Sequence, residues 1–126
     1  MNFTSFSQTE TRQLLLNTAN TVKLINHNQI IFVEADDNYS KLYLDDQSEF
    51  RLSKTLGLVE EEINNEMFFR CHRTYLVNVF FIKEISKGDD MSITLKNGSK
   101  IPLARRRLGN LRKLITDQTK PVIYSK

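Results

Sequence analysis

Arginine, histidine and tyrosine gather in one segment of the chain, residues 68–78, and three consecutive arginines follow at 105–107. The first segment reads FFRCHRTYLVN, so its polar groups stand between apolar runs that are typical of strands. The arginines come directly after a short apolar stretch, IPLA. Guanidinium groups bind phosphates and pair with base edges, guanine above all. These residue types therefore favour DNA as a partner.

The charge of the chain is divided unequally. Residues 1–66 contain 5 Lys or Arg against 11 Asp or Glu, whereas residues 67–126 contain 13 against 4. The formal net charge of +3 hides this division. Between Lys100 and Lys113 there are six cations and no acid, whereas a solvated surface usually mixes both signs. A basic face of this kind attracts a polyanion and releases its counterions on binding.

Length and composition fit one domain. A chain of 126 residues, 40% of them hydrophobic, is long enough to bury one core. No apolar run reaches the ~20 residues that span a bilayer, and no export signal is recognisable at the start. We therefore expect no membrane partner and a cytoplasmic location. The single cysteine, Cys71, fits a reducing compartment and is expected to be a small buried apolar group, with a redox switch as the alternative.

Short apolar runs between polar clusters predict a mainly β fold with antiparallel strands. The expected strands occupy residues 14–16, 22–25, 30–33, 38–44, 49–52, 81–85, 91–96 and 100–103. Asn97-Gly98 is the strongest hairpin signal in the chain, because both residue types tolerate a positive φ. The strand that begins at Lys100 should therefore fold back on the one before it.

Two helices complete the expected fold. The first covers 53–64, with Ser53 as its N-cap and an apolar stripe at Leu56, Val59 and Ile63. Its run of three glutamates is read as a solvated face, because adjacent helical carboxylates point in different directions and do not hold a metal together.

The second helix covers 106–115, and its leucine stripe is short enough to be buried by the domain's own sheets. We interpret residues 1–12 as a flexible N-terminal tail, 13–118 as one DNA-binding domain and 119–126 as a C-terminal tail.

The groups needed for catalysis are not brought together by the sequence. There is no Gly-rich phosphate loop and no pair of cysteines, and the two histidines, His27 and His72, lie far apart. The acidic residues Glu34, Asp36 and Asp37 are read as a loop that keeps strand edges soluble. We therefore predict no enzymatic activity, no metal and no cofactor.

Several of these segments, in this order, resemble the LytTR-type DNA-binding domain of bacterial transcriptional regulators. The similarity rests on FRCHRTYLVN at 69–78, IFVEA at 31–35 with a following Asn-Tyr, and IPLARR at 101–106. It extends from about Leu14 to about Leu114. The resemblance implies an elongated stack of antiparallel sheets with a short inserted helix and a short C-terminal helix. In such a domain, loops take the place of a recognition helix on the DNA.

The resemblance also implies roles for individual residues. The base-reading positions fall on Ser40, Arg73 and Arg105. Contacts with the DNA backbone or a groove edge are implied for the residues that flank them, which are Asn38, Tyr39, Lys41, His72 and Arg106.

The chemistry of the side chains supports part of this assignment. Arg73 and Arg105 suit guanine or a narrow minor groove. Three other cations suit phosphates that set the register: Lys100, Arg106 and Arg107. Two alternatives stay open, namely an ion pair of Arg73 with Glu34 or Glu84, and a buried, structural His72.

The chain departs from the family pattern in two ways. Ala104 stands where the family often has Ser, and the upstream receiver domain that members usually carry is not found in this sequence. The chain is thus either an excised effector domain or a regulator that works without a receiver.

The sequence therefore predicts a sequence-specific transcription regulator that is a monomer alone and pairs on direct repeats in double-stranded DNA. A receiver domain or a sensor kinase would be its further partners in the full system. The alternative from another class is a protein-interaction module whose basic face meets an acidic partner.

Overall fold

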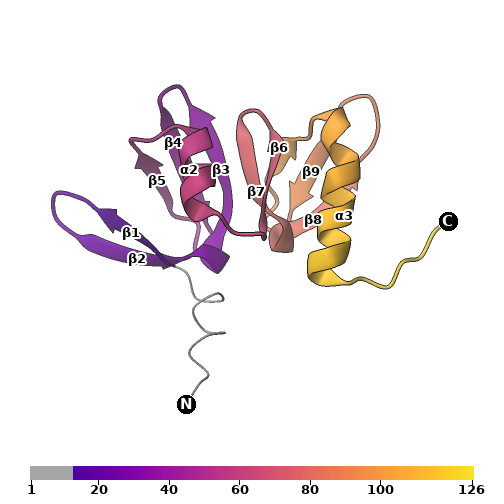
Figure 1. Cartoon of the computed structure of the whole chain (residues 1–126), viewed down its shortest axis with the longest axis horizontal. Coiled ribbons are helices and arrows are strands. Elements are labelled where there is room, and N and C mark those ends of the chain that lie inside the picture. The colour runs from indigo at the N-terminus through magenta and orange to yellow at the C-terminus, as the bar shows by residue number, and fades with distance from the viewer. Residues whose placement is uncertain (1–12) are drawn as a thin grey trace, which may run out of the picture.

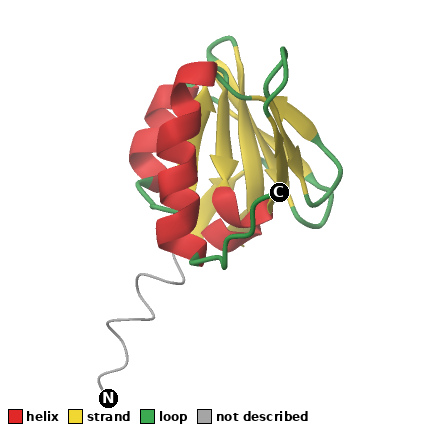
Figure 2. Cartoon of the chain, turned by 90° about the vertical axis from the view of Figure 1, so that its right-hand side faces the viewer, coloured by secondary structure: helices red, strands yellow, loops and turns green. Residues whose placement is uncertain are grey.

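The structure, a computed structural model, describes residues 13–126. Three antiparallel sheets follow one another along the long axis of the molecule (Figure 1). Both helices lie on the same side of the strands (Figure 2). The expected fold class, an elongated stack of antiparallel sheets with two short helices, is confirmed. The predicted tail at 1–12 lies outside the described residues.

The strands agree closely with the runs expected from the sequence, with one additional pair at 68–78. The strands are β1 (Gln13–Asn17), β2 (Val22–Asn26), β3 (Ile30–Asp36), β4 (Tyr39–Leu44), β5 (Glu49–Leu52), β6 (Phe68–His72), β7 (Tyr75–Asn78), β8 (Ile82–Ser86), β9 (Ser92–Leu95) and β10 (Lys100–Pro102). The helices are α2 (Leu56–Ile63) and α3 (Leu108–Thr119), and short 3-10 turns are η1 (His27–Gln29), η2 (Val79–Phe81) and η3 (Arg105–Arg107).

Sheet order decides which loops share an edge. The five-stranded sheet has the order β5-β4-β3-β7-β6, the three-stranded sheet has the order β10-β9-β8, and β1 and β2 form a separate hairpin. Every strand pair is antiparallel, so alternate connections return to the same edge. The β3–β4, β6–β7 and β8–β9 connections and the β10–η3 junction lie along this one edge (Figure 1).

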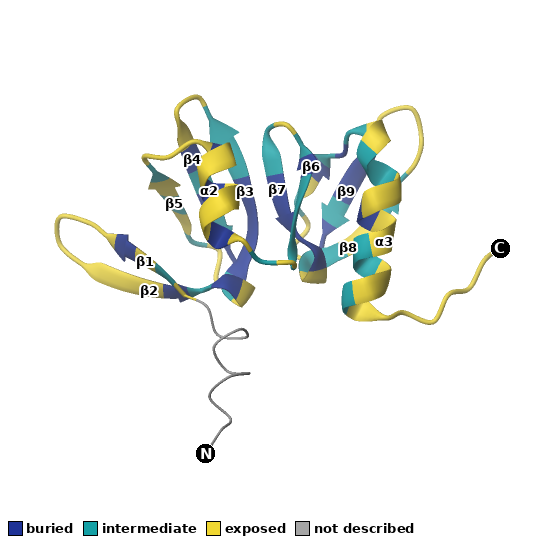
Figure 3. Ribbon diagram, in the orientation of Figure 1, coloured by how far each residue is buried: buried dark blue, intermediate teal, exposed yellow. Residues whose placement is uncertain are grey.

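The core has two parts that share the central strand β3. Ile30 and Val33 pack with α2 and the first hairpin, whereas Ile31 and Phe32 pack toward the three-stranded sheet and α3. A strand that is buried on both faces needs a continuous apolar run rather than an alternating one. The run IIFV meets this need, and Figure 3 shows the first part of β3 buried.

The first helix begins two residues later than its predicted cap. Thr55, not Ser53, is the N-cap, and its Oγ1 accepts a hydrogen bond from the main-chain N–H of Leu58 at 3.3 Å. Ser53 was the wrong choice because it lies in the bend that connects β5 with α2. The predicted buried stripe of α2 is confirmed.

The second helix also starts later than expected. Residues 105–107 form η3, and the regular helix runs from Leu108 to Thr119 instead of 106–115. The three arginines therefore stand in a tight turn at the junction of sheet and helix.

The Asn97-Gly98 hairpin is confirmed between β9 and β10. Of these two residues, only Gly98 has a positive φ, at 93°. Asn97 contributes differently, because its side-chain oxygen accepts the main-chain N–H of Ser99 at 2.9 Å. No helix within residues 13–126 is long and apolar enough to cross a membrane.

Candidate nucleic-acid interface

Most of the predicted DNA-contacting residues lie on the loop edge described above. Asn38 and Tyr39 are exposed at the β3–β4 turn, Arg73 is exposed at the β6–β7 turn, and Arg105 and Arg106 are exposed at the β10–η3 junction. These turns are spread along the long axis of the molecule (Figure 1). The geometry is that of a row of contact points, suited to an extended ligand.

The β6–β7 turn is held in place by Arg70. Its Nη2 donates to the main-chain oxygen of Arg73 at 2.6 Å, and its Nε donates to the main-chain oxygen of His72 at 3.2 Å. Its Nη1 lies 2.8 Å from a carboxylate oxygen of Glu60 on α2. The turn that carries Arg73 is therefore fastened to the helix by a side chain that sequence reasoning did not single out.

Arg73 itself forms no ion pair within residues 13–126. Glu34, one of its two predicted alternatives, accepts hydrogen bonds at 2.9 Å from the hydroxyls of Tyr43 and Tyr75. Burial, together with these bonds to a carboxylate, raises the pKa of the Tyr75 hydroxyl to about 12. The carboxylate of Glu34 is thus engaged inside the sheet, and the Arg73 side chain is exposed.

His72 is half-buried and orders the same turn. The main-chain N–H of Thr74 donates to His72 Nδ1 at 3.2 Å, and the Thr74 hydroxyl lies 2.9 Å from the same nitrogen. Since Nδ1 accepts a hydrogen bond, the proton of the neutral ring lies on Nε2. The predicted alternatives for His72, a structural residue and a DNA contact, are compatible in this position.

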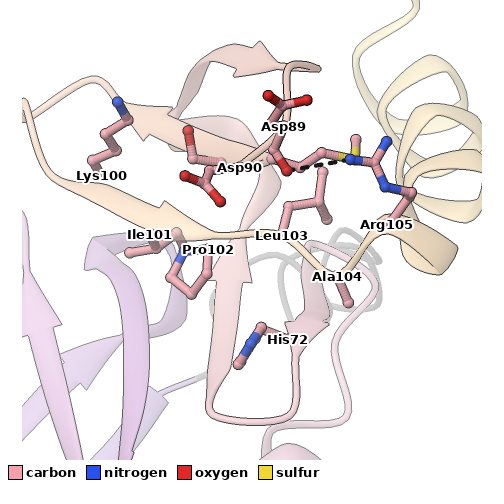
Figure 4. Close-up of a pocket in the computed structure, with 11 residues that line it drawn as sticks. His72, Asp89, Asp90, Lys100, Ile101, Pro102, Leu103, Ala104 and Arg105 are labelled. Atoms are coloured by element: carbon pink, nitrogen blue, oxygen red, sulfur yellow. Dashed lines mark hydrogen bonds between the residues drawn. The ribbon is translucent and has the colours of Figure 1, made fainter.

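Arg105 lies at the rim of a hollow of about 630 Å³. Its Nη2 donates to the main-chain oxygens of Gly88 and Asp89, at 3.2 and 3.3 Å, so the β8–β9 loop orients the guanidinium (Figure 4). Lys100 stands at the opposite end of this hollow in Figure 4.

The lining mixes apolar and charged residues and includes Ser92, whose buried hydroxyl has no hydrogen-bond partner within residues 13–126. The lining residues are His72, Asp89, Asp90, Met91, Ser92, Lys100, Ile101, Pro102, Leu103, Ala104 and Arg105.

The junction that carries the arginines is anchored to β6. The main-chain N–H of Ala104 donates to the oxygen of Cys71, and that of Arg107 donates to the oxygen of Ala104, both at 2.8 Å. Arg107 is half-buried, whereas Arg106 is exposed. These main-chain bonds place the third contact point at a fixed distance from the second.

Cys71 is fully buried between these contact points, as predicted. Its thiol lies 3.6 Å from the main-chain oxygen of Pro102. Burial raises the pKa of the thiol to about 12, and the nearby Arg107 and Arg70 offset only part of that effect. The sulfur is therefore a protonated, apolar packing group at neutral pH, and the structure gives no support to the redox alternative.

Ser40 is not exposed to DNA, although the sequence predicts a base-reading role for it. Its side chain is fully buried, and its hydroxyl donates to the main-chain oxygen of Lys54 at 2.8 Å. Ser40 points to the same side of β4 as the buried Leu42, because side chains two apart on a strand share a face. Its position conflicts with a base-reading role, and it instead fastens the connection between β5 and α2.

Two cations near the β3–β4 turn, Arg51 and Lys54, were not predicted from the sequence. The guanidinium of Arg51 stacks over the ring of Tyr39 at 4.3 Å and lies 3.5 Å from Asp36. Lys41, which was predicted, is opposite Arg51 in the register of β4 and β5 and lies 3.9 Å from Glu49. The sequence already predicts a turn at 45–48, and this turn sets the register of β4 and β5. Pairing the two strands residue by residue from the turn would have placed Arg51 opposite Lys41.

The second missed cation is Lys54, whose Nζ lies 2.7 Å from Glu62. Within the described part of the chain, no three His, Cys, Asp or Glu residues form a group that could hold a metal ion.

Comparisons with known proteins agree with this arrangement. The family model for the LytTr DNA-binding domain matches residues 20–116. The chain is 30% identical over 105 residues to the sensory transduction protein LytT of Bacillus subtilis, a match that covers 82% of this chain and 43% of that protein.

A more distant relative is the CO-responsive transcriptional regulator RcoM of Rhodospirillum rubrum, which is 23% identical over 107 residues, or 82% of this chain and 45% of RcoM. The chain thus spans less than half the length of these two relatives.

A solved structure supports the same fold. The LytTr DNA-binding domain of a putative methyl-accepting/DNA response regulator from Bacillus cereus superposes with a TM-score of 0.68 at 23% identity. The match covers 82% of this chain and 95% of that one.

Proposed function

This chain belongs to the LytTr DNA-binding domain family, and we propose that it regulates transcription by reading direct repeats in promoter DNA through the loops of one edge. The observation that carries the proposal is the exposure of Arg73 and Arg105 on that same edge, each on a turn fixed by guanidinium-to-carbonyl contacts. The ordered backbone at Arg73 and the oriented guanidinium of Arg105 lose less conformational entropy on binding than free groups would.

The roles of the contact residues follow from their chemistry. Arg73 and Arg105 read base edges, as bidentate donors to guanine or as insertions into a narrow minor groove. Arg106 and Arg107, at the junction, and Lys100, at the start of β10 next to the 96–99 turn, set the register on phosphates. His72 contributes its Nε2–H at the groove edge, between the base-reading residues Arg73 and Arg105.

At the β3–β4 turn, the proposal replaces Ser40 by its exposed neighbours. Asn38 carries an amide that suits the paired donor and acceptor of adenine. Tyr39 is covered by Arg51, so the pair presents a flat cationic surface to the DNA backbone, and Lys41 lies beside it.

The longer relatives suggest how the domain is controlled. LytT is named for sensory transduction and RcoM for a response to CO. We place the signal input of this protein outside the DNA-binding domain, in a receiver domain or a sensor kinase of the full system.

The proposal is tested by selection from a pool of random duplexes with the purified chain at near-physiological salt. The expected result is a motif with two similarly oriented half-sites. Uniform recovery that disappears as salt is raised would instead show nonspecific polyanion binding, and the proposal would fail. Failure to retain any duplex, together with capture of an acidic protein, would favour the interaction-module alternative.

A further inference from the structure

The two ends of the molecule each expose apolar side chains. At one end, Leu15 and Leu24 stand opposite each other in the β1–β2 hairpin and therefore share a face, to which Val22 belongs as well. These three side chains are 56% to 66% exposed. The opposite face, with Leu16 and Ile25, is buried in the core.

A groove lies beside this face, between β1 and β5. Its volume is about 290 Å³, and its apolar lining includes Leu15, Leu16, Phe50 and Leu52. Both flanking strands are at the edge of their sheets. An edge strand offers unpaired main-chain donors and acceptors to an added extended segment.

An extended apolar segment is present at the other end of the molecule. After α3, the chain continues through Val122, Ile123 and Tyr124, which are 72% to 90% exposed. β-Branched and aromatic residues favour an extended strand. Lys120, in the left-handed conformation, and the following Pro121 separate this segment from the helix.

The half of the molecule that includes the hairpin and the C-terminal end differ in net charge. Residues 13–66, which include the hairpin and β5, carry four Lys or Arg against ten Asp or Glu. The C-terminal end carries exposed cations at Arg112, Lys113 and Lys120. An end-to-end approach of two copies therefore brings the net acidic half of one copy toward the basic end of the other, while the groove itself is lined by Arg51 and by no carboxylate.

The loop edge that carries Arg73 and Arg105 determines how two copies approach each other on DNA. The contact loops follow the long axis, so the DNA axis runs along the molecule and tandem copies lie end to end (Figure 1). Copies on direct repeats have the same orientation, so the C-terminal end of one faces the hairpin of the next. The β1–β2 hairpin and the C-terminal segment both lie on the side away from this loop edge (Figure 1).

We propose that residues 121–124 of one copy dock in the groove between β1 and β5 of the adjacent copy on DNA. The inference rests on the proposed function, since DNA sets the two copies side by side. A contact of a few side chains is too small for a stable dimer in solution. Binding to neighbouring half-sites makes it effectively intramolecular, which is sufficient for cooperativity. The contact is heterologous, as direct repeats require, whereas a two-fold contact would demand a palindrome.

The test compares binding to duplexes that carry one half-site and two direct half-sites. Ile123→Asp alters the docking segment and Leu15→Asp alters the groove, and both positions are exposed. Asn28→Asp, which is exposed on η1, adds the same charge elsewhere. We expect wild type and Asn28→Asp to bind two sites cooperatively, by on the order of 10-fold. Ile123→Asp and Leu15→Asp should each lose this factor with unchanged single-site affinity.

Mixing the two defective variants gives a sharper result. A Leu15→Asp copy still has its docking segment and an Ile123→Asp copy still has its groove, so one of the two orders on DNA re-forms the contact. The mixture should regain part of the cooperativity.

If either variant folds poorly, its single-site affinity will show this. A synthetic peptide of residues 119–126, with a scrambled peptide as control, then tests wild type directly and should suppress cooperativity. Cooperativity that survives both substitutions, or the peptide, would overturn the docking proposal. Absence of specific binding to one half-site by wild type would instead overturn the proposed function.

Discussion

The guanidinium of Arg70 joins the main-chain oxygen of Arg73, at 2.6 Å, to the carboxylate of Glu60, at 2.8 Å. It thereby connects a helix with the turn that presents a predicted base-reading residue. Arg70 is a positioning residue in this account, since its own donors are used within the protein.

Arg70→Lys should weaken binding to a matched duplex although the Arg73 side chain is unchanged. Lysine cannot supply three donors in a planar fork, so the turn loses bonds worth roughly 1–3 kcal/mol in stability. We expect reduced preference for the matched over the scrambled duplex, measured by fluorescence anisotropy. Arg112→Lys, on the exposed face of α3, is the control. A loss of thermal stability with no loss of sequence preference would contradict the positioning role.

Arg105→Ala and Lys100→Ala should change DNA binding in two different ways. Removing a base contact at Arg105 should cost on the order of 1–3 kcal/mol and relax preference at one or two base pairs. Removing a phosphate contact at Lys100 should weaken all duplexes alike and reduce the salt slope by about one unit. Titrations on matched and scrambled duplexes at several salt concentrations separate the two effects. Equal behaviour of the two variants would refute the assigned roles.

Local signals in the sequence were reliable where one short segment decides the outcome. Gly98 lies in the hairpin it predicted, and the apolar stripe of α2 is buried. Family resemblance and residue chemistry together located the exposed Arg73 and Arg105. In each case, the property depends on backbone preference or on charge.

Properties that depend on pairing between strands were harder to predict. The burial of Ser40 follows from the face of β4 that meets α2, and a one-residue change of register would reverse it. The bulge between Arg70 and His72 likewise interrupts the simple alternation of faces along β6. Ser53 and Thr55 are both favourable N-cap residue types, so local preference alone did not decide where α2 begins.

Ser40→Ala should affect stability and leave the DNA preference intact. The substitution removes a buried hydrogen bond and leaves the Lys54 carbonyl without this donor, at a cost of roughly 1–3 kcal/mol. Urea denaturation measures the free energy of unfolding, and Ser53→Ala, on the exposed connection, is the control. Altered base preference at unchanged stability would restore the base-reading role of Ser40.

The stability of the domain should fall above about pH 9 because of Cys71. Burial raises the pKa of the folded thiol from 9.0 to about 12, so the unfolded chain ionises first. The stabilising contribution of Cys71 is complete below pH 9 and is lost as the pH rises toward 12. Between pH 9 and 10, where ionising tyrosines affect both proteins alike, Cys71→Ala should show a flatter decline in urea midpoint than wild type. Parallel declines would contradict a buried, protonated thiol.

The same burial predicts that binding resists mild oxidation. Wild type and Cys71→Ala should keep equal affinity for a matched duplex after brief peroxide treatment, because a protonated, inaccessible thiol reacts slowly. Loss of binding by wild type alone would re-establish the redox alternative.

The central claim is that one loop edge meets the DNA, and amide chemical shifts of the labelled protein test it most directly. On adding a matched duplex, the largest changes should occur at 37–39, 73–74 and 105–107. Two loops at the opposite edge that carry no proposed contact, at 45–48 and 64–67, should change least. Shifts concentrated in those opposite loops, or spread evenly over both edges, would contradict the account.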